Sequence, residues 1–526
     1  MEKQTVTDTG MRLLKKGQKG IVHAIFSRLG IIMLLFVVQL LFFVAGLFWF
    51  NSFLPQIFGG STVIAMVMVL YLINTRIDPT AKITWLIIIM LLPVFGSLLF
   101  LYTQLEIGHR AFKERFREIT DETDGEILQD PEVLKRFYED EPGGAALSHY
   151  IRRSGCFPVY DKTDVSYYPV GEDMFEDMLK QLEQAEHFIF SEYFIIDEGE
   201  MWGRVLEILS RKAKEGVDVR VMYDGTNEFV NLPHDYPKRL EALGIKCKMF
   251  APLSPFVSTH YNYRDHRKIL VIDGHTAFTG GINFADRYIN RESPLGHWKD
   301  TAVMVKGDGA KTFSLMFLQM WGIDEDETDF KTFLSYPTFP PETSRGYVLP
   351  YGDCPLDSEK VGEQVYIDLL NRAKSYVHIM TPYLILDGEM ENAIKYAAER
   401  GVEVALILPG IPDKKLPYSL AKGHYASLID SGVKIYEYVP GFVHAKSFVI
   451  DDHEAVVGTI NLDYRSLYHH FECAAYLNGA SCIPDIEKDF QESLKKCRPI
   501  SRDTIWEGHR LLRPLGFVAK AVAPLL

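Results

Sequence analysis

Cysteine is scarce in this sequence, and its few residues form no recognisable motif. The six cysteines include no Cys-x-x-Cys pair and no zinc-binding spacing: Cys156, Cys247, Cys354, Cys473, Cys482 and Cys497. A disulfide framework and a structural zinc site are therefore excluded as the basis of the fold. Scattered reduced thiols favour a catalytic part on the cytoplasmic face of a membrane, although they are also compatible with the other face.

An excess of positive charge is also absent. The chain has 56 Lys and Arg against 70 Asp and Glu, a formal net charge of −14. A protein that binds nucleic acid by neutralising phosphates needs the opposite balance, so we expect no nucleic-acid partner. At 526 residues the chain is too long for one hydrophobic core, and about three domains are expected.

Charged side chains are missing from three stretches near the N-terminus, residues 29–50, 53–73 and 83–102. Each stretch has about the 20 apolar residues that a helix needs to cross a bilayer. We therefore predict a membrane anchor over residues 1–105, with either three transmembrane helices or two and a re-entrant or interfacial segment. The protein is accordingly expected in the cell membrane as a multi-pass protein.

Basic residues flank these stretches on both sides. Six precede the first stretch, and four follow the last: Lys3, Arg12, Lys15, Lys16, Lys19 and Arg28, then Arg110, Lys113, Arg115 and Arg117. Positively charged flanks stay in the cytoplasm, so both groups favour the inside, which three full spans would not allow. The catalytic part is expected at the cytoplasmic face, and the number of spans stays open.

Beyond residue 140 the sequence shows strand and helix patterns that occur twice. An apolar strand over residues 187–197 is followed by a helix end, a glycine and a strand over residues 213–224, and residues 377–408 repeat this order. Such βαβ units predict an α/β fold with mixed sheets. We expect two similar lobes, residues 140–325 and 345–505, joined by an acidic, proline-rich linker. An apolar tail over residues 506–526 either lies in the membrane interface or packs on the second lobe.

Two segments with identical spacing carry the strongest functional signal. Each has a His, a Lys two positions on and an Asp five further, then a Gly-x-x-Asn: His266, Lys268, Asp273 and Asn283 in the first, His444, Lys446, Asp451 and Asn461 in the second. Residues two apart in a strand share a face, so each His lies beside its Lys. One copy could arise by chance, whereas two matching copies indicate one site built by both lobes.

Tight two-residue turns after the aspartates would fold each segment into a hairpin. Asn283 then faces His266 and Gly281 faces Lys268, while Asn461 and Thr459 take the equivalent places. A small residue at Gly281 or Thr459 would let an anion approach the backbone closely. Such a spot suits a phosphodiester: one imidazole attacks phosphorus, the Lys and Asn groups stabilise its oxygens, and a second imidazole transfers the proton.

These segments resemble the paired HKD motifs of the phospholipase D superfamily, and the surrounding sequence resembles that of the cardiolipin synthases. The further matching pieces are Asp78-Pro79, Trp85, residues 93–96, 298–300, 381–383, 438–444 and 461–466. The resemblance covers residues 74–526 and implies two phospholipase D-like lobes behind N-terminal transmembrane helices. It implies that His266 is the nucleophile and His444 the general acid and base, with no metal or other cofactor.

Other residues have supporting parts. Asp273 and Asp451 belong to the motifs, but their spacing from the histidines points to turn stabilisation rather than phosphate contact. Asp300 and Glu472, at matching places downstream, are the candidates to orient the imidazoles. The pair His469 and His470 is expected in a loop or on the surface, because no ligand partner stands at metal spacing.

The family pattern differs here at three positions. Gly281 and Thr459 stand where the superfamily commonly has Ser, and cardiolipin synthases resemble this chain in tolerating both replacements. His470 stands where the family usually has an Asn, two residues before Glu472. The resemblance implies transfer of a phosphatidyl group from one phosphatidylglycerol to another with release of glycerol, with phosphatidylglycerol and membrane lipids as partners. Phospholipase D hydrolysis or transfer using another phospholipid is the alternative, ahead of a nuclease or a non-catalytic membrane scaffold.

Overall fold

A computed structural model describes residues 60–104, 110–155, 157–251, 263–341, 344–357, 359–521 and 523–525. From the apolar stretch over residues 29–50 it describes only Val37, Leu41 and Ala45, each within a helix. Apart from these three residues, the first predicted span lies outside the described residues.

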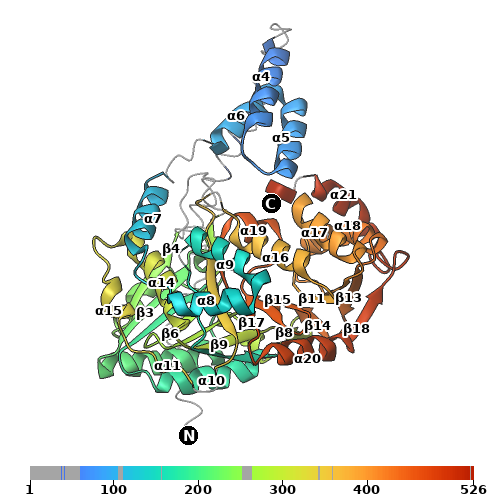
Figure 1. Cartoon of the computed structure of the whole chain (residues 1–526). Helices are drawn as coiled ribbons and strands as arrows, with labels where there is room; N and C mark the ends of the chain where they lie inside the picture. The colour runs from blue at the N-terminus through green and yellow to red at the C-terminus, as the bar shows by residue number, and fades with distance from the viewer. Residues whose placement is uncertain are drawn as a thin grey trace.

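The first lobe is built on a seven-stranded sheet with the order β1-β9-β7-β6-β2-β3-β4. Its strands are β1 (Thr163–Tyr168), β2 (Phe188–Tyr193), β3 (Asp218–Asp224), β4 (Lys246–Phe250), β6 (Lys268–Ile272), β7 (Thr276–Gly280) and β9 (Ala302–Gly307). β2, β3 and β4 are parallel, and the other neighbours are antiparallel. Helices α10 (Gly171–Glu183) and α11 (Glu200–Glu215) pack with one side of the sheet, and α14 (Ala310–Trp321) packs with the other (Figure 1).

The second lobe repeats this sheet strand for strand, in the order β10-β17-β16-β15-β11-β12-β13, with β18 added at the edge. Its strands are β10 (Tyr347–Asp353), β11 (Tyr376–Met380), β12 (Glu403–Pro409), β13 (Lys434–Tyr438), β15 (Ser447–Ile450), β16 (Glu454–Gly458), β17 (His470–Asn478) and β18 (Cys497–Ile500). The main helices of this lobe are α16 (Val361–Arg372), α17 (Gly388–Glu399), α18 (Lys415–Asp430), α19 (Tyr464–Tyr468) and α20 (Ile483–Leu494). The predicted α/β fold with two similar mixed sheets is confirmed.

Short strands connect the lobes to each other. β5 (Arg264–Asp265), which precedes the first motif, pairs in parallel with the start of β17 in the second lobe. β8 (His297–Lys299) of the first lobe pairs in parallel with β14 (Gly441–Val443) of the second. These two crossings lie directly beside the two motifs, so each lobe fixes the backbone next to the other lobe's site residues.

Three helices project from one end of the two lobes, next to the C-terminus (Figure 1). They are α4 (Gly60–Asn74), α5 (Pro79–Leu91) and α6 (Pro93–Gln104), which pack around Trp85 and Phe100, with ring centroids 5.2 Å apart. Asp78 caps α5, since its carboxylate accepts from the backbone N–H groups of Thr80 and Ala81 at 2.8 and 3.0 Å.

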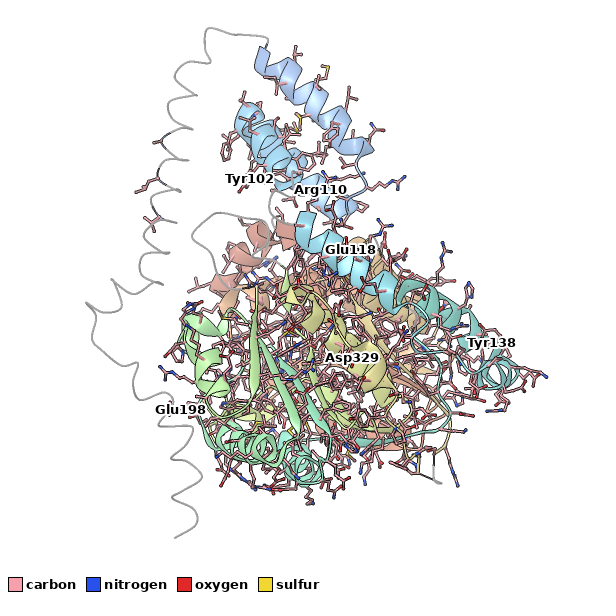
Figure 2. All side chains as sticks on the ribbon, turned by 90° about the vertical axis from the view of Figure 1, so that its left-hand side faces the viewer. Tyr102, Arg110, Glu118, Tyr138, Glu198 and Asp329 are labelled. Carbon is pink, nitrogen blue, oxygen red and sulfur yellow. The ribbon has the colours of Figure 1, made fainter. Side chains whose placement is uncertain are left out.

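The predicted span over residues 83–102 is not one helix. α5 ends at Leu91, and α6 begins at Pro93, because proline has no N–H group to continue the helical hydrogen bonds. Across the part of the chain that the structure describes, no helix combines the length and the apolar content that a membrane span requires. The chain leaves the projecting helices through α7 (Arg110–Thr123), where Figure 2 labels Arg110 and Glu118, and joins the lobes through α8 (Pro131–Asp140) and α9 (Pro142–Gly155).

The tail forms the helix α21 (Arg513–Lys520), which packs against α18. Pro514, expected to interrupt a helix, stands in its first turn, where a missing N–H group is tolerated. Gly516 and Ala519 face the lobe, whereas Leu511 and Val518 are 95% and 70% exposed. The tail also meets the projecting helices, because the hydroxyl of Thr84 donates to the carbonyl of Ala521 at 2.8 Å.

Candidate active site

Each motif lies on a β-hairpin, as predicted, but the register differs by one residue. Leu270 pairs with Phe278 and Ser447 with Val457, whereas two-residue turns would have paired Leu270 with Thr279 and Ser447 with Gly458. The turns hold three residues, 273–275 and 451–453, and both begin with an Asp in the left-handed region, at φ 49° for Asp273 and 53° for Asp451. Asp tolerates this region through its short polar side chain. The facing pairs expected from a two-residue turn are therefore wrong.

The motif aspartates lie at the opposite end of their strands from the histidines. The carboxylate of Asp273 accepts from three successive backbone N–H groups, 186–188, at 2.8 Å each. Asp451 accepts in the same way from the N–H groups of residues 374–376, at 2.7 to 2.8 Å. Both carboxylates thus hold the start of the neighbouring strand, β2 or β11, and the structure does not bring them to the imidazoles.

The two motif histidines are each paired with a carboxylate of the other lobe. His266 Nδ1 lies 2.9 and 3.0 Å from the two oxygens of Glu472, on β17. His444 Nδ1 lies 2.7 Å from Asp300 Oδ2, just after β8. A carboxylate on Nδ1 fixes the tautomer that leaves Nε2 with its lone pair. The candidates named from the sequence are therefore placed beside the imidazoles, in a crossed arrangement.

Burial sets the protonation of these groups. Desolvation lowers the pKa of His266 to about 3 and that of His444 to about 4, against the pull of the carboxylates. Burial alone would raise the pKa of Glu472, but His266 beside it holds that pKa well below its usual range. Asp300 is held below its usual pKa by His444 in the same way. Both imidazoles are thus neutral at physiological pH, with ionised carboxylates behind them.

Both motif lysines have a lowered pKa and therefore lose their positive charge at a lower pH than an exposed lysine. Desolvation lowers the pKa of Lys268 to about 8 and that of Lys446 to about 7. Lys268 Nζ donates to the carbonyl of His266, and Lys446 Nζ to that of His444. The charge on Lys268 also lowers the pKa of His444 and of Lys446, so the two half-sites face each other at short electrostatic range.

The motif asparagines differ in their partners. Asn283 Oδ1 accepts from the N–H of Ile195 at 3.0 Å, and its Nδ2 donates to the hydroxyl of Tyr288 at 2.9 Å. Asn461 Oδ1 is buried and has no hydrogen-bond partner among the described residues. The amide of Asn461 is therefore the one with capacity left for a ligand.

The small residues after the motif glycines serve the carboxylates. A Cβ at Gly281 would lie 1.9 Å from Asp300 Oδ1, so the missing side chain makes room for Asp300 rather than for an anion at the backbone. Thr459 takes the equivalent place in the second lobe, and its hydroxyl donates to Glu472 Oε2. The two half-sites thus use these positions differently.

His470 is a site residue that the sequence analysis placed wrongly. It is only 8% exposed, and its ring centroid lies 5.3 Å from that of His266, whereas a loop or surface position was expected. β17 begins at His470, so His470 and Glu472 point to the same face of one strand. The spacing of two from Glu472 was the signal that could have found it.

Aromatic rings cover both imidazoles. Trp298 and Tyr288 lie 5.3 and 5.5 Å from the ring of His444, and Phe194 lies 5.0 Å from that of His266, measured between centroids. None of the three is part of a motif, although Trp298 lies in one of the segments that resemble cardiolipin synthases. Rings packed against the imidazoles contribute to the desolvation that lowers their pKa.

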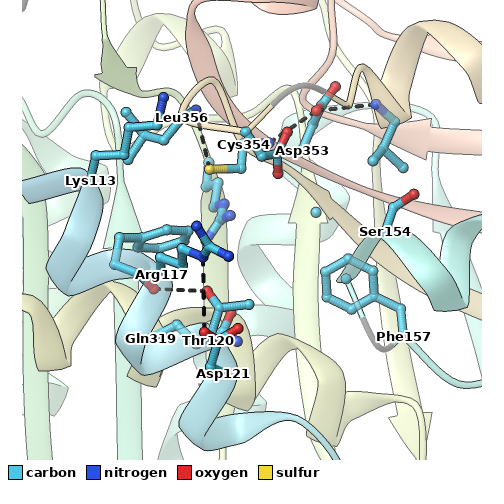
Figure 3. A pocket seen from close by; sticks show the side chains of 16 residues that line it. Lys113, Arg117, Thr120, Asp121, Ser154, Phe157, Gln319, Asp353, Cys354 and Leu356 are labelled. Atoms are coloured by element: carbon cyan, nitrogen blue, oxygen red, sulfur yellow. Dashed lines mark hydrogen bonds and ion pairs between the residues drawn. The ribbon is translucent and has the colours of Figure 1, made fainter. Parts of the chain in front are cut away.

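A cavity of about 480 Å³ lies beside the centre, behind Arg267. Lys113 and Arg117 reach into it from α7, and Ser154 and Phe157 form the opposite wall (Figure 3). Arg267 connects the two places, because its Nε donates to the carbonyl of Glu472 at 3.2 Å. The motif histidines do not line this cavity, so it is separate from the catalytic centre.

Comparison with family models covers both lobes. The model described as cardiolipin synthase, PLD-like domain matches residues 178–321 and 366–494. The model described as phospholipase D-nuclease N-terminal matches residues 63–102, which are the three projecting helices.

Similar proteins span nearly the whole chain. An uncharacterized protein of Streptococcus mutans is 54% identical and covers 87% of this chain and 99% of its own. A cardiolipin synthase of Alkalihalophilus pseudofirmus is 32% identical and covers 89% of this chain and 94% of its own. Among solved structures, phosphatidylserine synthase from Haemophilus influenzae shares the fold, with a TM-score of 0.55 and 14% identity over 72% of this chain and 98% of its own.

Proposed function

The chain belongs to the cardiolipin synthase family of the phospholipase D superfamily, and we propose that it transfers a phosphatidyl group between two phosphatidylglycerol molecules and releases glycerol. Family membership makes it a phosphatidyltransferase. The observation that carries the specific proposal is the crossed pair of His–carboxylate contacts, in which a carboxylate on Nδ1 leaves Nε2 of each buried imidazole with its lone pair.

The first step forms a covalent intermediate. His266 Nε2 attacks the phosphorus of one phosphatidylglycerol, an N–P bond forms, and the P–O bond to the headgroup glycerol breaks. The negative phosphate raises the pKa of His444 from its resting value of about 4, so that His444 gains a proton and gives it to the departing alkoxide. Lys268 and Lys446 stabilise the charge on the non-bridging oxygens.

In the second step the bond to His266 breaks, and the proton moves in the opposite direction, from the incoming alcohol to His444. The headgroup hydroxyl of a second phosphatidylglycerol loses its proton to the now neutral His444 and attacks phosphorus. The P–N bond breaks, His266 regains its lone pair, and cardiolipin is released. Transfer to the lipid rather than to water depends on the aromatic rings of Trp298, Tyr288 and Phe194, which limit access of water to the intermediate.

The apolar end of the molecule supports a place at the cell membrane, and the basic residues that flank it support a position of the lobes at the cytoplasmic face. Many large apolar side chains of α4–α6 are exposed, and Leu511 and Val518 of the tail are exposed nearby. Soluble proteins rarely expose so continuous an apolar surface.

Replacing Leu511 and Val518 by Ser should lower activity on bilayers more than on dispersed short-chain lipid, whereas equal losses would mean that these side chains serve the fold.

Purified full-length protein incubated with labelled phosphatidylglycerol in micelles tests the reaction. We expect cardiolipin and free glycerol in equal amounts. Phosphatidic acid as the main product would mean hydrolysis, and product formation only with another phospholipid would mean a different donor or acceptor. Either result would overturn the proposed reaction.

A further inference from the structure

A third imidazole, that of His470, lies beside His266 and Glu472 and has no part in the proposed mechanism. His470 is buried, yet its Nδ1 has no hydrogen-bond partner within the described parts of the chain. It lies 3.6 Å from Glu472 Oε1, which is too far for a good hydrogen bond. Buried polar atoms are nearly always satisfied, so Nδ1 of His470 has capacity for a ligand beyond its long contact with Glu472.

His470, His266 and Glu472 together form a ligand set. Each offers one donor atom, and the three atoms all lie within 4.8 Å of one another. Two imidazoles and one carboxylate are a set that binds zinc and leaves the fourth position open. The set is fixed by backbone pairing, because β5 pairs with β17 through His470 and Phe471, and the N–H of His266 donates to the carbonyl of Phe471 at 3.0 Å.

The donor types select the metal. Mg²⁺ and Ca²⁺ prefer sites made of oxygen atoms alone, whereas imidazole suits zinc and neighbouring transition metals. A second cluster, Glu363, Asp387 and Glu389, offers only carboxylates and lies at a different place in the second lobe. The nitrogen-rich set at His266 is therefore the one suited to a transition metal.

We propose that His266, His470 and Glu472 bind a divalent transition-metal ion of the zinc type, and that this ion switches the enzyme off. An ion on Nδ1 of His266 replaces the hydrogen bond to Glu472 and moves the imidazole proton from Nδ1 to Nε2. Nε2 then has no lone pair to attack phosphorus, and no proton leaves the ring. An ion on Nε2 would occupy the nucleophilic atom directly.

Binding is tested without turnover by titrating the full-length protein in detergent with Co²⁺ and recording its visible absorption. We expect about one equivalent with the strong bands of four-coordinate Co²⁺, displaced by Zn²⁺ and not by Mg²⁺. H470N should weaken binding at least tenfold, whereas H469N, which removes the adjacent imidazole outside the set, should keep it. Absence of these bands in the unaltered protein, or equal bands in H470N, would overturn the site.

Inhibition is tested by measuring cardiolipin formation at buffered free Zn²⁺, with each variant normalised to its own metal-free rate. This part rests on the proposed function of His266. We expect loss of activity that a chelator restores, and an inhibitory concentration at least tenfold higher for H470N than for H469N. Equal inhibition of both variants would contradict the switch. If no variant forms cardiolipin under any condition, the proposed function fails, and the Co²⁺ titration still decides the metal site.

Discussion

Each half-site is built on the same kind of β-hairpin, but the residues around its carboxylate differ between the two. In the first-lobe position Gly281 leaves space for Asp300, which contacts His444 and lies 3.4 Å from the indole N–H of Trp298. In the second-lobe position Thr459 donates to Glu472, which also lies next to His266 and His470. A duplicated backbone therefore carries two unequal environments.

The difference fits unequal work by the two imidazoles. A nucleophile must be held in one orientation while it carries a phosphoryl group, and Glu472 is itself fixed by a hydroxyl on one oxygen. A general acid and base must gain and lose a proton within each cycle, and His444 Nδ1 lies next to both Asp300 and Lys446 Nζ, the latter at 3.0 Å. The comparison teaches that chain symmetry does not require equal chemistry.

Replacing either motif histidine by asparagine should have the largest effect on activity. H266N and H444N should each lower turnover on the order of 10⁴-fold or more, because each removes a member of one catalytic unit. Labelled substrate should leave no phosphohistidine on H266N, whereas H444N should accumulate it slowly. A phosphohistidine that forms readily on H266N would mean that the two roles are reversed.

Neutralising the crossed carboxylates tests which step each lobe supports. E472Q and D300N should lower turnover by about 10² to 10⁴-fold, since the imidazole tautomer is no longer fixed. In single-turnover measurements E472Q should slow formation of the intermediate, and D300N should slow release of glycerol and transfer to the acceptor. E487Q is a matched control, because Glu487 pairs with His378 at 2.9 Å outside the site and should leave turnover near normal. Identical effects of E472Q and D300N on both steps would contradict the proposed division of roles between His266 and His444.

Exchanging the small residues tests the unequal surroundings. G281A should lower activity by roughly tenfold to a hundredfold, because the added Cβ would displace Asp300. T459V should cost about 1 to 2 kcal/mol, near tenfold in rate, through loss of one hydrogen bond to a charged group. Steady-state kinetics with circular dichroism as a folding control measure both, and a G281A enzyme with unchanged kinetics would contradict the packing argument.

The two lysines should give the smallest effect, a shift in pH dependence. Both pKa values are lowered, to about 7 for Lys446 and about 8 for Lys268, so positive charge is lost as the pH rises through this range. In the free enzyme kcat/KM should already decline above pH 4, because His444, the general acid, has a pKa of about 4, and the decline should steepen above pH 7 as the lysines lose their charge. Neutral His266, with a pKa of about 3, imposes no loss down to pH 4. K446R keeps its charge and should move the fall toward pH 8, whereas K268R should move it less. A flat profile from pH 6 to 9 would contradict the assignment.

Much of the architecture could be predicted from the sequence, because the repeat is visible in it. The spacing of the two motifs, the βαβ patterns and the candidates Asp300 and Glu472 all follow from strand periodicity and duplication. The crossing of the carboxylates could not be derived, because β5 and β8 pair with the opposite lobe and such pairing leaves no local signal.

The errors have local physical causes. The hairpin register was missed because Asp273 and Asp451 adopt the left-handed conformation and lengthen the turns to three residues. The apolar stretch over residues 83–102 contains Pro93, which was the available signal for the interruption between α5 and α6. His470 was missed because its partner His266 lies more than 200 positions away in the chain.

The crossed contacts also bear on how such a protein can be divided. A lobe produced alone would keep its nucleophile or its acid but would lack the carboxylate that orients it, and would also lose the strand pairing beside it. A working centre could then arise only if two lobes associate and exchange carboxylates in both directions. Such a reciprocal exchange has the symmetry of a closed dimer, so the single chain has the site geometry of a dimer whose subunits have been fused.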